Sequence, residues 1–460
     1  DNIYASTPGL TTLKVLLTQA VQRQWPILLG DVSTAFLHAP MTTTYYVRPP
    51  KEYYPDDSVV WKLKKALYGL KDSPRVWQDY LANELEKLGG RRFKSDGNVY
   101  YFEKYETYLL VYVDDLMALG NKADTLLQEI QKVVSLKILQ KLDVGTTGEF
   151  LGRKLRREHN RMILTNKHDY IDELLEYYGL TTAKIATTPY SNTNDTTLDD
   201  EPLGKEEARH YRSAVGKLVW LIPLRPDTTY STKELTRQFS SPTTSGLRQL
   251  KHLLRYYKGT KDYEFCLEPR ECNNKYTEVL GYVDSDWAGC TTTRRSTSGG
   301  TIMFLGTNIL HYSRTQATIA TSSGEAELYA IGTGTSELLA LYNFIGELRL
   351  YRRIVLRILT DSTTAKSITT RFGGGKRSKH IQLKYLFIQD LVREGALQVQ
   401  KVCTTKNLAD VLTKGVSQET LLRHLEHLGV TKNYLPPLSP PPTSQLVTRS
   451  TQPSPNPHYP

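Results

Sequence analysis

Two adjacent carboxylates, Asp114 and Asp115, separate two apolar runs within residues 108–119. The runs are rich in β-branched and aromatic residues, so each is predicted to be a strand, with the carboxylates at the tip of a β-hairpin. Two neighbouring carboxylates repel one another at neutral pH unless a cation is present. Hard oxygen ligands of this kind suit Mg²⁺, which shares its shell with substrate phosphates. An ordinary polar turn is the alternative interpretation.

A third carboxylate, Asp31, ends a predicted strand over residues 25–31, which follows a helical apolar period over residues 10–24. A carboxylate at a strand end is exposed above the sheet, where ligands commonly bind. An N-cap for the next turn is the alternative role of Asp31.

A basic, glycine-containing loop precedes a predicted helix, with Ser73 as its N-cap, Pro74 as its first residue and Gly89 at its end. Lys71 and Arg75 flank the N-terminus of this helix, which could therefore receive a phosphate. A capped amphipathic helix with solvated charges is the alternative.

Four further carboxylates occur where the chain alternates between strands and helices: Asp284, Glu327, Asp361 and Asp410. The predicted order is three strands, a helix over residues 323–341, a strand, two helices, a strand and a helix, which describes a compact mixed-sheet α/β unit. Carboxylates that converge at strand ends can hold two divalent ions, which clamp the attacking and leaving oxygens of a phosphodiester displacement. Any one of the four alone would be surface decoration.

The segments between these groups complete the organisation. The predicted elements are a helix over 121–140, strands near 149–155 and 162–164, a helix over 166–179, a linker from Thr187 to Pro202, basic helices over 206–259 and a helix over 381–394. The basic helices could follow a phosphate backbone or present a solvated face. The proline-rich tail from Leu435 is predicted to be disordered.

Composition limits the class of protein. A chain of 460 residues with 39% hydrophobic residues fits two or three packed domains. The net charge of +11 and the pI near 9.2 favour a polyanionic partner, with nucleic acid first. The four cysteines lack metal or CxxC spacing, which argues against a zinc site or a disulfide framework. No apolar run could span a membrane and no secretory signal is present, while the first residues suggest a fragment of a longer protein.

The motifs together resemble the reverse transcriptase and RNase H region of copia-type LTR retrotransposon Pol polyproteins. The front half carries Asp31-Val-Ser-Thr-Ala-Phe-Leu, Leu67-Tyr-Gly-Leu-Lys-Asp-Ser-Pro-Arg-Val-Trp77 and Tyr112-Val-Asp-Asp115. The back half carries Gly281-Tyr-Val-Asp-Ser-Asp-Trp-Ala-Gly289, Arg294-Arg-Ser-Thr-Ser-Gly-Gly, Thr321-Ser-Ser-Gly-Glu-Ala-Glu327, Lys379-His-Ile and Asn407-Leu-Ala-Asp410-Val-Leu-Thr-Lys. The resemblance covers most of residues 5–415.

The resemblance implies a role for each matching residue. Asp31 and Asp114 would be the main ligands of two Mg²⁺ ions, with Asp115 supporting them and Mn²⁺ as a substitute metal. Phe36 would be the steric gate that excludes ribonucleotides. The residues Gly69, Lys71, Ser73, Pro74 and Arg75 would line the incoming nucleotide and template, and Leu151 and Gly152 would grip the primer end. In the RNase H site, Asp284, Glu327, Asp361 and Asp410 would hold two metal ions, Asp286 and Glu325 would be neighbours, and His380 matches a family histidine.

The implied fold class is α/β (α+β), with a polymerase palm. The implied units are a reverse transcriptase domain over residues 1–186 with truncated fingers and a partial thumb, a linker over 187–205, a helical connection over 206–275, an RNase H domain over 276–416 and a C-terminal extension over 417–460. The basic strand segment that precedes the first helix in the family is absent, as are protease, integrase and zinc-knuckle patterns.

The implied function is an RNA-directed DNA polymerase with RNase H activity, using two-metal-ion catalysis. Its partners would be an RNA template, a DNA primer, an RNA–DNA hybrid and dNTPs, with no membrane; the oligomeric state stays open. The implied location is the cytoplasm, within a virus-like particle, and also the nucleus. Three alternatives remain: a polymerase-dead remnant that keeps nucleic-acid binding or RNase H activity, a transposase or integrase of the RNase H fold, and a purely structural α/β protein.

Overall fold

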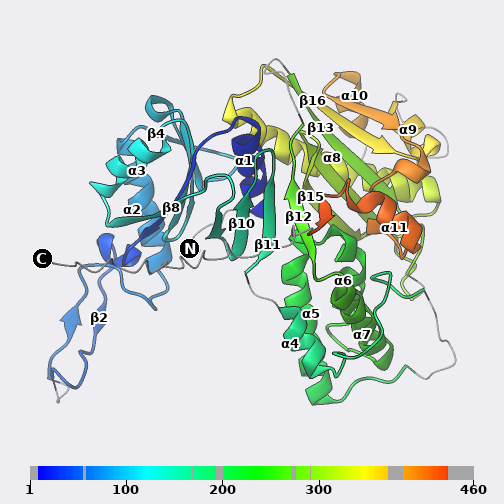
Figure 1. The fold of residues 1–460 in the computed structure, drawn as a ribbon, viewed down its shortest axis with the longest axis horizontal. Helices are drawn as coiled ribbons and strands as arrows, with labels where there is room; N and C mark the ends of the chain where they lie inside the picture. Colours follow the sequence, from blue (N-terminus) through cyan, green and yellow to red (C-terminus); the bar gives the residue numbers. More distant parts are fainter. Residues whose placement is uncertain are drawn as a thin grey trace, which may run out of the picture.

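The computed structural model describes residues 9–54, 58–167, 170–192, 200–270, 276–290, 292–370 and 387–433, and Figure 1 shows how their helices and strands are arranged. His380, the start of the helix predicted over 381–394 and the proline-rich tail from Leu435 lie outside the described residues. The predicted α/β fold class is confirmed, since three mixed or antiparallel sheets are each packed against helices. None of the described helices combines the length and the apolar character needed to cross a membrane.

The first sheet carries the predicted hairpin and has the strand order β4-β5-β6-β7-β1-β8, with every pair antiparallel. Its strands are β1 (Ile27–Val32), β4 (Gly90–Arg92), β5 (Val99–Phe102), β6 (Thr107–Tyr112), β7 (Asp115–Gly120) and β8 (Leu136–Lys141). Both faces are covered. Helices α2 (Ser73–Lys87) and α3 (Ala123–Gln131) pack on one face, and α1 (Leu10–Gln22) packs on the other. Successive residues of a strand point to opposite faces, so the continuous apolar run in β7 contributes to two cores.

The helix predicted over residues 121–140 is wrong in its second half. Helix α3 ends at Gln131, and residues 136–141 form β8, which pairs with β1. Residues 133–138 contain the β-branched Val133, Val134 and Ile138, and edge pairing with β1 outweighs the helical spacing that they share with α3. This strand matters for the site because it fixes the far side of the strand that carries Asp31.

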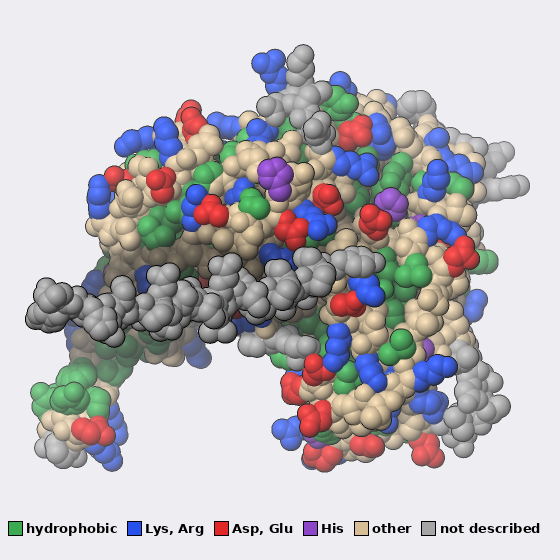
Figure 2. All heavy atoms as spheres, in the orientation of Figure 1, with side chains coloured by type: hydrophobic (Ala, Val, Ile, Leu, Met, Phe, Trp, Pro, Cys, Tyr) green, Lys and Arg blue, Asp and Glu red, His purple; other side chains and the backbone are tan. Residues whose placement is uncertain are grey.

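A narrow arm projects from the first sheet. It holds β2 (Tyr46–Val47) and β3 (Trp61–Lys62), which pair antiparallel. The arm leaves the body after the 3-10 helix η1 (Ala35–His38) and returns before α2. Figure 2 shows hydrophobic side chains gathered at its end, and Figure 1 shows β2 standing away from the other sheets.

The second sheet joins segments that are far apart in the sequence, in the order β18-β12-β11-β10-β9. Its strands are β9 (Thr147–Phe150), β10 (Arg153–Arg157), β11 (Met162–Asn166), β12 (Tyr263–Leu267) and β18 (Val430–Lys432). The single strand predicted over residues 149–155 is therefore two strands of a hairpin. The predicted division into units does not follow the sheets, because this one takes strands from the reverse transcriptase, connection and C-terminal segments.

The predicted basic helical segment is present as a bundle. Its elements are α5 (Lys205–Leu221), η3 (Ile222–Leu224), η4 (Pro226–Thr228), α6 (Thr229–Thr236) and α7 (Thr244–Gly259), with α4 (Tyr170–Tyr177) packed against α7. Two of its basic side chains face the protein rather than solvent. His252 bonds the Thr188 carbonyl at 2.9 Å, and the Lys258 ammonium donates to the Ala183 carbonyl at 2.7 Å. His252 thus holds the start of the predicted linker, and Lys258 holds the segment just before it.

The third sheet has the predicted mixed topology, with the order β15-β14-β13-β16-β17. Strands β13, β14 and β15 are antiparallel neighbours, whereas β16 runs parallel to β13 and to β17. The elements are β13 (Tyr276–Ser285), β14 (Thr297–Phe304), β15 (Thr307–Thr315), α8 (Ser323–Leu348), β16 (Arg353–Thr360), α9 (Thr363–Thr370), α10 (Phe387–Arg393), β17 (Leu397–Lys401), η6 (Thr404–Lys406), η7 (Asp410–Leu412) and α11 (Gln418–Leu425).

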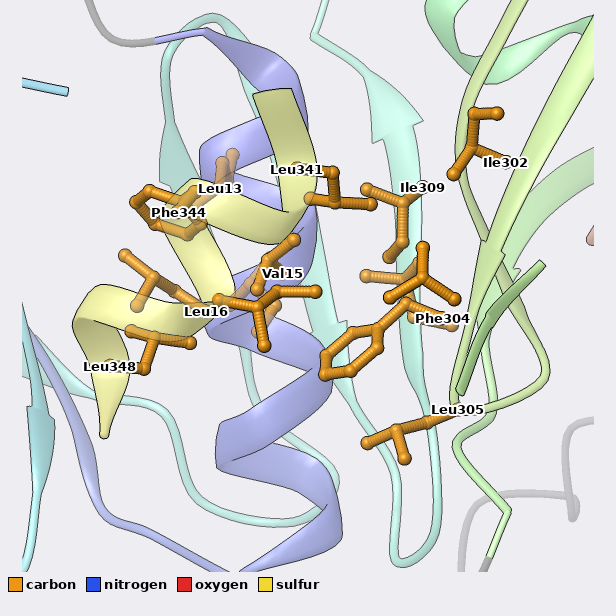
Figure 3. Close-up of a cluster of buried hydrophobic side chains, with 14 of the residues drawn as sticks. Leu13, Val15, Leu16, Ile302, Phe304, Leu305, Ile309, Leu341, Phe344 and Leu348 are labelled. Carbon is orange, nitrogen blue, oxygen red and sulfur yellow. The ribbon is translucent and has the colours of Figure 1, made fainter. Parts of the chain in front are cut away.

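Helix α1 joins the first and third sheets through one hydrophobic core. Figure 3 shows Leu13 and Leu16 of α1 beside Phe344 and Leu348 of α8, with Phe304 and neighbouring residues of the third sheet on the other side. Most residues of α1 are buried, including Lys14, whose ammonium donates to the Pro223 carbonyl at 2.7 Å. Because one helix is shared, the two sheets that carry the predicted carboxylate groups are parts of one packed body.

Candidate active sites

The Asp114-Asp115 pair lies at a tight turn between β6 and β7, as the apolar runs predict. Tyr112 pairs with Asp115, so Val113 and Asp114 form a two-residue loop. Val113 has a φ of 55°, in the left-handed region that a β-branched residue rarely adopts. Such a conformation costs about 1–3 kcal/mol and persists where the surroundings hold it. Here the Val32 amide donates to the Asp114 carbonyl at 2.8 Å and the Trp77 indole donates to the Val113 carbonyl at 2.7 Å.

Asp31 joins this pair through strand register. Strand β1 pairs antiparallel with β7, which places Asp31 directly opposite Asp115. The pKa of Asp115 is raised to about 6, chiefly by burial and also by the nearby negative charges of Asp114 and Asp31. A carboxylate that resists ionisation beside two others is typical of a site that takes up a cation.

The loop before α2 packs against the helix η1. Phe36 packs against Tyr68 with ring centroids 4.4 Å apart, and Gly69 has a φ of 95°. Pro74 is in the first turn of α2, Lys71 is exposed, and Arg75 lies 3.6 Å from Asp79 on the surface of the helix.

Ser73 is not the predicted N-cap of α2. It is the first residue of the helix after Asp72, and no side chain caps this end. Its hydroxyl instead donates to the Leu67 carbonyl at 2.6 Å and accepts from the Leu67 amide at 3.1 Å. Both bonds of the hydroxyl are made within the loop before α2, so the hydroxyl does not cap the N-terminus of the helix.

The predicted primer-end residues form the turn of the β9–β10 hairpin. Leu151 and Gly152 have φ values of 50° and 68°, as a two-residue hairpin turn requires. Lys167 follows β11 directly and is ion-paired with Glu149 at 2.6 Å. Its positive charge lowers the pKa of Asp115, although burial raises that pKa by more. This hairpin region therefore lies close enough to the first carboxylate group to act on it electrostatically.

The second carboxylate group is gathered more tightly. Asp284 ends β13, Glu327 lies in the first turns of α8, and Asp361 follows β16. One oxygen from each lies within 4.8 Å of the others, and this is the only such group of three found among the described residues. The parallel pairing of β13 with β16 brings two of the three together, because both strands end at the same edge.

Burial gives this group an unusual electrostatic state. The pKa of Asp284 is raised to about 6 and that of Glu327 to about 8, in both cases chiefly by burial. The Ser285 amide and hydroxyl both donate to Glu327 Oε1, at 3.2 and 3.0 Å, whereas the buried Glu327 Oε2 has no partner among the described residues. An unpartnered buried carboxylate oxygen beside two other carboxylates fits a divalent cation with oxygen ligands.

Asp410 lies beside this group but not within it. Its Oδ1 is ion-paired with the Lys414 ammonium at 2.5 Å, although its charge still raises the pKa of Asp284. The predicted neighbours are bonded elsewhere. Glu325 accepts from the Thr321 amide and hydroxyl at 2.7 and 2.6 Å, and Asp286 accepts from the Thr297 amide.

Sequence reasoning missed the residues that support these carboxylates. They are Trp77 at the hairpin carbonyl, Lys167 near Asp115, Ser285 on Glu327, Thr413 whose hydroxyl donates to Asp284, and Lys414 on Asp410. Trp77, Ser285 and Thr413 bond residues that are remote in the sequence, whereas Lys414 pairs with Asp410 only four residues away. Trp77, Ser285, Thr413 and Lys414 lie within the family motifs, but their residue types gave them no role there, and Lys167 lies outside the motifs.

The raised carboxyl pKa values make stability depend on pH when no metal is bound. Between about pH 4 and pH 8 the native protein binds more protons at Asp284 and Glu327 than the unfolded chain does. We therefore expect the unfolding free energy in EDTA to fall by several kcal/mol as the pH rises through this range, since each unit of raised pKa corresponds to about 1.4 kcal/mol. Denaturant titrations at several pH values measure it.

Glu327→Gln supplies the comparison, since it cannot ionise. Its pH slope in EDTA should be shallower than that of the wild type, and Mg²⁺ should flatten the wild-type slope more than that of the variant. Equal slopes in the two proteins would contradict the raised pKa of Glu327.

Comparisons with known proteins agree with the motifs. Residues 1–192 match the family model for reverse transcriptase (RNA-dependent DNA polymerase). The Pol polyprotein of transposon RE1 from Arabidopsis thaliana is 33% identical over 432 residues, which cover 92% of this chain and 28% of that protein. The putative transposon Ty5-1 protein of Saccharomyces cerevisiae is 30% identical over 308 residues, which cover 65% of this chain and 96% of that protein. The chain belongs to the copia-type retrotransposon Pol family.

This copia-type chain spans less than a third of the length of the Arabidopsis relative. Among solved structures, a foamy viral protease-reverse transcriptase in complex with dsDNA aligns with 84% of the chain and 70% of its own length, at 11% identity and a TM-score of 0.42.

Proposed function

We propose that the chain is an RNA-directed DNA polymerase with RNase H activity, which copies RNA into DNA and degrades the RNA strand of the hybrid. The observation that carries the proposal is that a member of this family holds two separate carboxylate groups, each at the end of a sheet, in one packed body. Figure 2 shows an open recess between the projecting arm and the helical bundle, and the basic chain favours nucleic acid as its occupant.

At the first group, Asp31 and Asp114 would hold the metal ions and Asp115 would support them. The primer 3′-oxygen would bond to the α-phosphorus of a dNTP while the bond to the leaving pyrophosphate breaks. Two Mg²⁺ ions, when bound, lower the pKa of the attacking hydroxyl or water and stabilise the leaving oxygen, and Mn²⁺ can take their place. Lys71 and Arg75, which lie near the start of α2, would attract the triphosphate.

At the second group, Asp284, Glu327 and Asp361 would hold the metal ions, and Asp410 is kept as a fourth ligand by family resemblance. Thr413 and Ser285 orient the first two carboxylates, and the buried Glu327 Oε2 has no hydrogen-bond partner in the described part of the chain. An attacking water would replace the 3′-oxygen of an RNA phosphodiester. The RNA strand would be recognised by its 2′-hydroxyls.

The test measures both reactions on the same protein. Primer extension on an RNA template with dNTPs and cleavage of end-labelled RNA within a hybrid are followed in Mg²⁺, in Mn²⁺ and in EDTA. We expect both activities with either metal and neither in EDTA. A wild-type protein that extends no primer and cleaves no hybrid would overturn the proposal.

A chain that retains hybrid cleavage alone is the second candidate. The tighter gathering of the second carboxylate group favours it, since the oxygens of Asp31, Asp114 and Asp115 do not meet within the same distance. Cleavage without extension in the same assay would select this candidate. The cytoplasmic, particle-associated and nuclear locations stay predictions.

Phe36 provides a prediction about sugar selection. Its ring is held against Tyr68, five residues after Asp31 in the chain, where by family resemblance it would fill the space of a ribose 2′-hydroxyl. We expect Phe36→Ala to lower the preference for dNTPs over rNTPs by about 10-fold or more, because a hydroxyl-sized space opens. Single-nucleotide insertion gives kcat/KM for each nucleotide.

Leu37→Ala is the matched control, since Leu37 is the next residue on the same 3-10 helix and is exposed. It should leave the preference within twofold. If Phe36→Ala leaves the preference unchanged, the ring is not the gate.

A further inference from the structure

Trp77 lies at the place where three segments of the first site meet. We propose that it is a positioning residue, which holds the carboxylate hairpin in register with the nucleotide loop; the inference rests on the proposed polymerase function. Trp77 is 1% exposed and lies on α2, three residues beyond Pro74. Its indole N–H donates to the Val113 carbonyl at 2.7 Å, directly before Asp114 in the chain.

The geometry of the peptide bond explains why this contact acts on the carboxylate. The Val113 carbonyl and the Asp114 nitrogen belong to one planar peptide unit. Holding the carbonyl oxygen therefore fixes the direction of the bond from which the Asp114 side chain departs. Val113 has left-handed backbone, so this peptide unit has other orientations to relax into if the indole is removed.

The same indole also packs beside the 3-10 helix that carries the gate. Its ring lies 6.1 Å from the ring of His38, on the 3-10 helix that carries Phe36. Ser73 is the first residue of α2, and its hydroxyl bonds the backbone of Leu67. Leu67 directly precedes Tyr68 in the loop. Helix α2 thus connects the loop, the 3-10 helix and the hairpin: Ser73 bonds the loop, and Trp77 contacts the other two.

An ordinary core role for Trp77 makes a different prediction. If only its bulk mattered, any aromatic ring of similar size would serve, and loss of the ring would destabilise the whole domain. Trp77→Phe separates the two roles, because it keeps an aromatic ring in the core and removes the N–H donor.

Trp25 offers a matched control for this substitution. It is a buried tryptophan against the same sheet, and its ring packs on Tyr108 with centroids 5.4 Å apart. Among the described residues its indole N–H has no hydrogen-bond partner. Trp25→Phe therefore removes the same atoms without removing a donor to the hairpin.

The experiment compares both variants with the wild type in primer extension, hybrid cleavage and hydrogen exchange. Trp77→Phe should lower kcat for extension by about 10–100-fold, the scale of a small misplacement of a catalytic group, and raise the Mg²⁺ concentration for half-maximal extension several-fold. Hybrid cleavage should stay within twofold. Trp25→Phe should leave extension, its Mg²⁺ dependence and cleavage within twofold.

Hydrogen exchange makes the test independent of activity. The Val32 amide, which bonds the Asp114 carbonyl, should exchange faster in Trp77→Phe and at the wild-type rate in Trp25→Phe. Unchanged extension and exchange in Trp77→Phe would overturn the inference, as would an equal loss of both activities. A wild type that extends no primer refutes the polymerase proposal instead, and the exchange rates still decide the role of Trp77.

Discussion

Asp114→Asn is expected to reduce primer extension by at least roughly 10²–10³-fold, the scale of losing one charged contact in a transition state. The substitution keeps the size of the side chain and removes its charge. The turn should survive, because its bonds use the backbone carbonyls of Val113 and Asp114 rather than the carboxylate. The loss should therefore appear in kcat and in the Mg²⁺ requirement, with thermal stability unchanged. Steady-state primer extension over a range of Mg²⁺ concentrations measures both quantities.

Two controls make this result specific. Hybrid cleavage by the same Asp114→Asn protein should stay within twofold, because the second carboxylate group lies on another sheet. Asp124→Asn, an exposed residue at the start of α3, should leave both activities unchanged. Wild-type extension by Asp114→Asn would remove the hairpin from the active site.

The second large effect is expected for Asp284→Asn, which should abolish hybrid cleavage to a similar degree while primer extension continues. Asp284 is 5% exposed and shares its site with Glu327 and Asp361. An asparagine can still accept the hydrogen bond from Thr413, so the local fold should persist. What is lost is the charge that would bind the metal ion. Removing one of three clustered acidic groups should also stabilise the metal-free protein at pH 8.

Asp390→Asn is the matched control in the same part of the chain. Asp390 lies on α10, is largely exposed and pairs with Arg393. Its variant should cleave hybrid at the wild-type rate. Hybrid cleavage by Asp284→Asn at the wild-type rate would show that the second site has been placed wrongly, whatever the primer-extension result.

Local patterns predicted much of the fold and the identity of the candidate residues. The apolar runs beside Asp114 predicted the hairpin, because strand formation there depends on residues within a few positions. The order of strands and helices after residue 276 predicted the third sheet, and α8 begins where the sequence places it, at Ser323. The wrong predictions came from local patterns that are compatible with both a helix and a strand. Residues 136–141 were assigned to a helix because their partner strand, β1, lies about a hundred residues earlier.

The tertiary structure alone decided how these residues meet. It placed Asp31 opposite Asp115, gathered Asp284, Glu327 and Asp361, and left Asp410 in an ion pair with Lys414. It also decided that α1 is shared between the two carboxylate-bearing sheets. Such facts depend on which distant surfaces are buried against each other, and burial is a property of the folded chain. The sequence by itself determined which residues could do the chemistry; packing determined which of them share a site and how strongly each holds its proton.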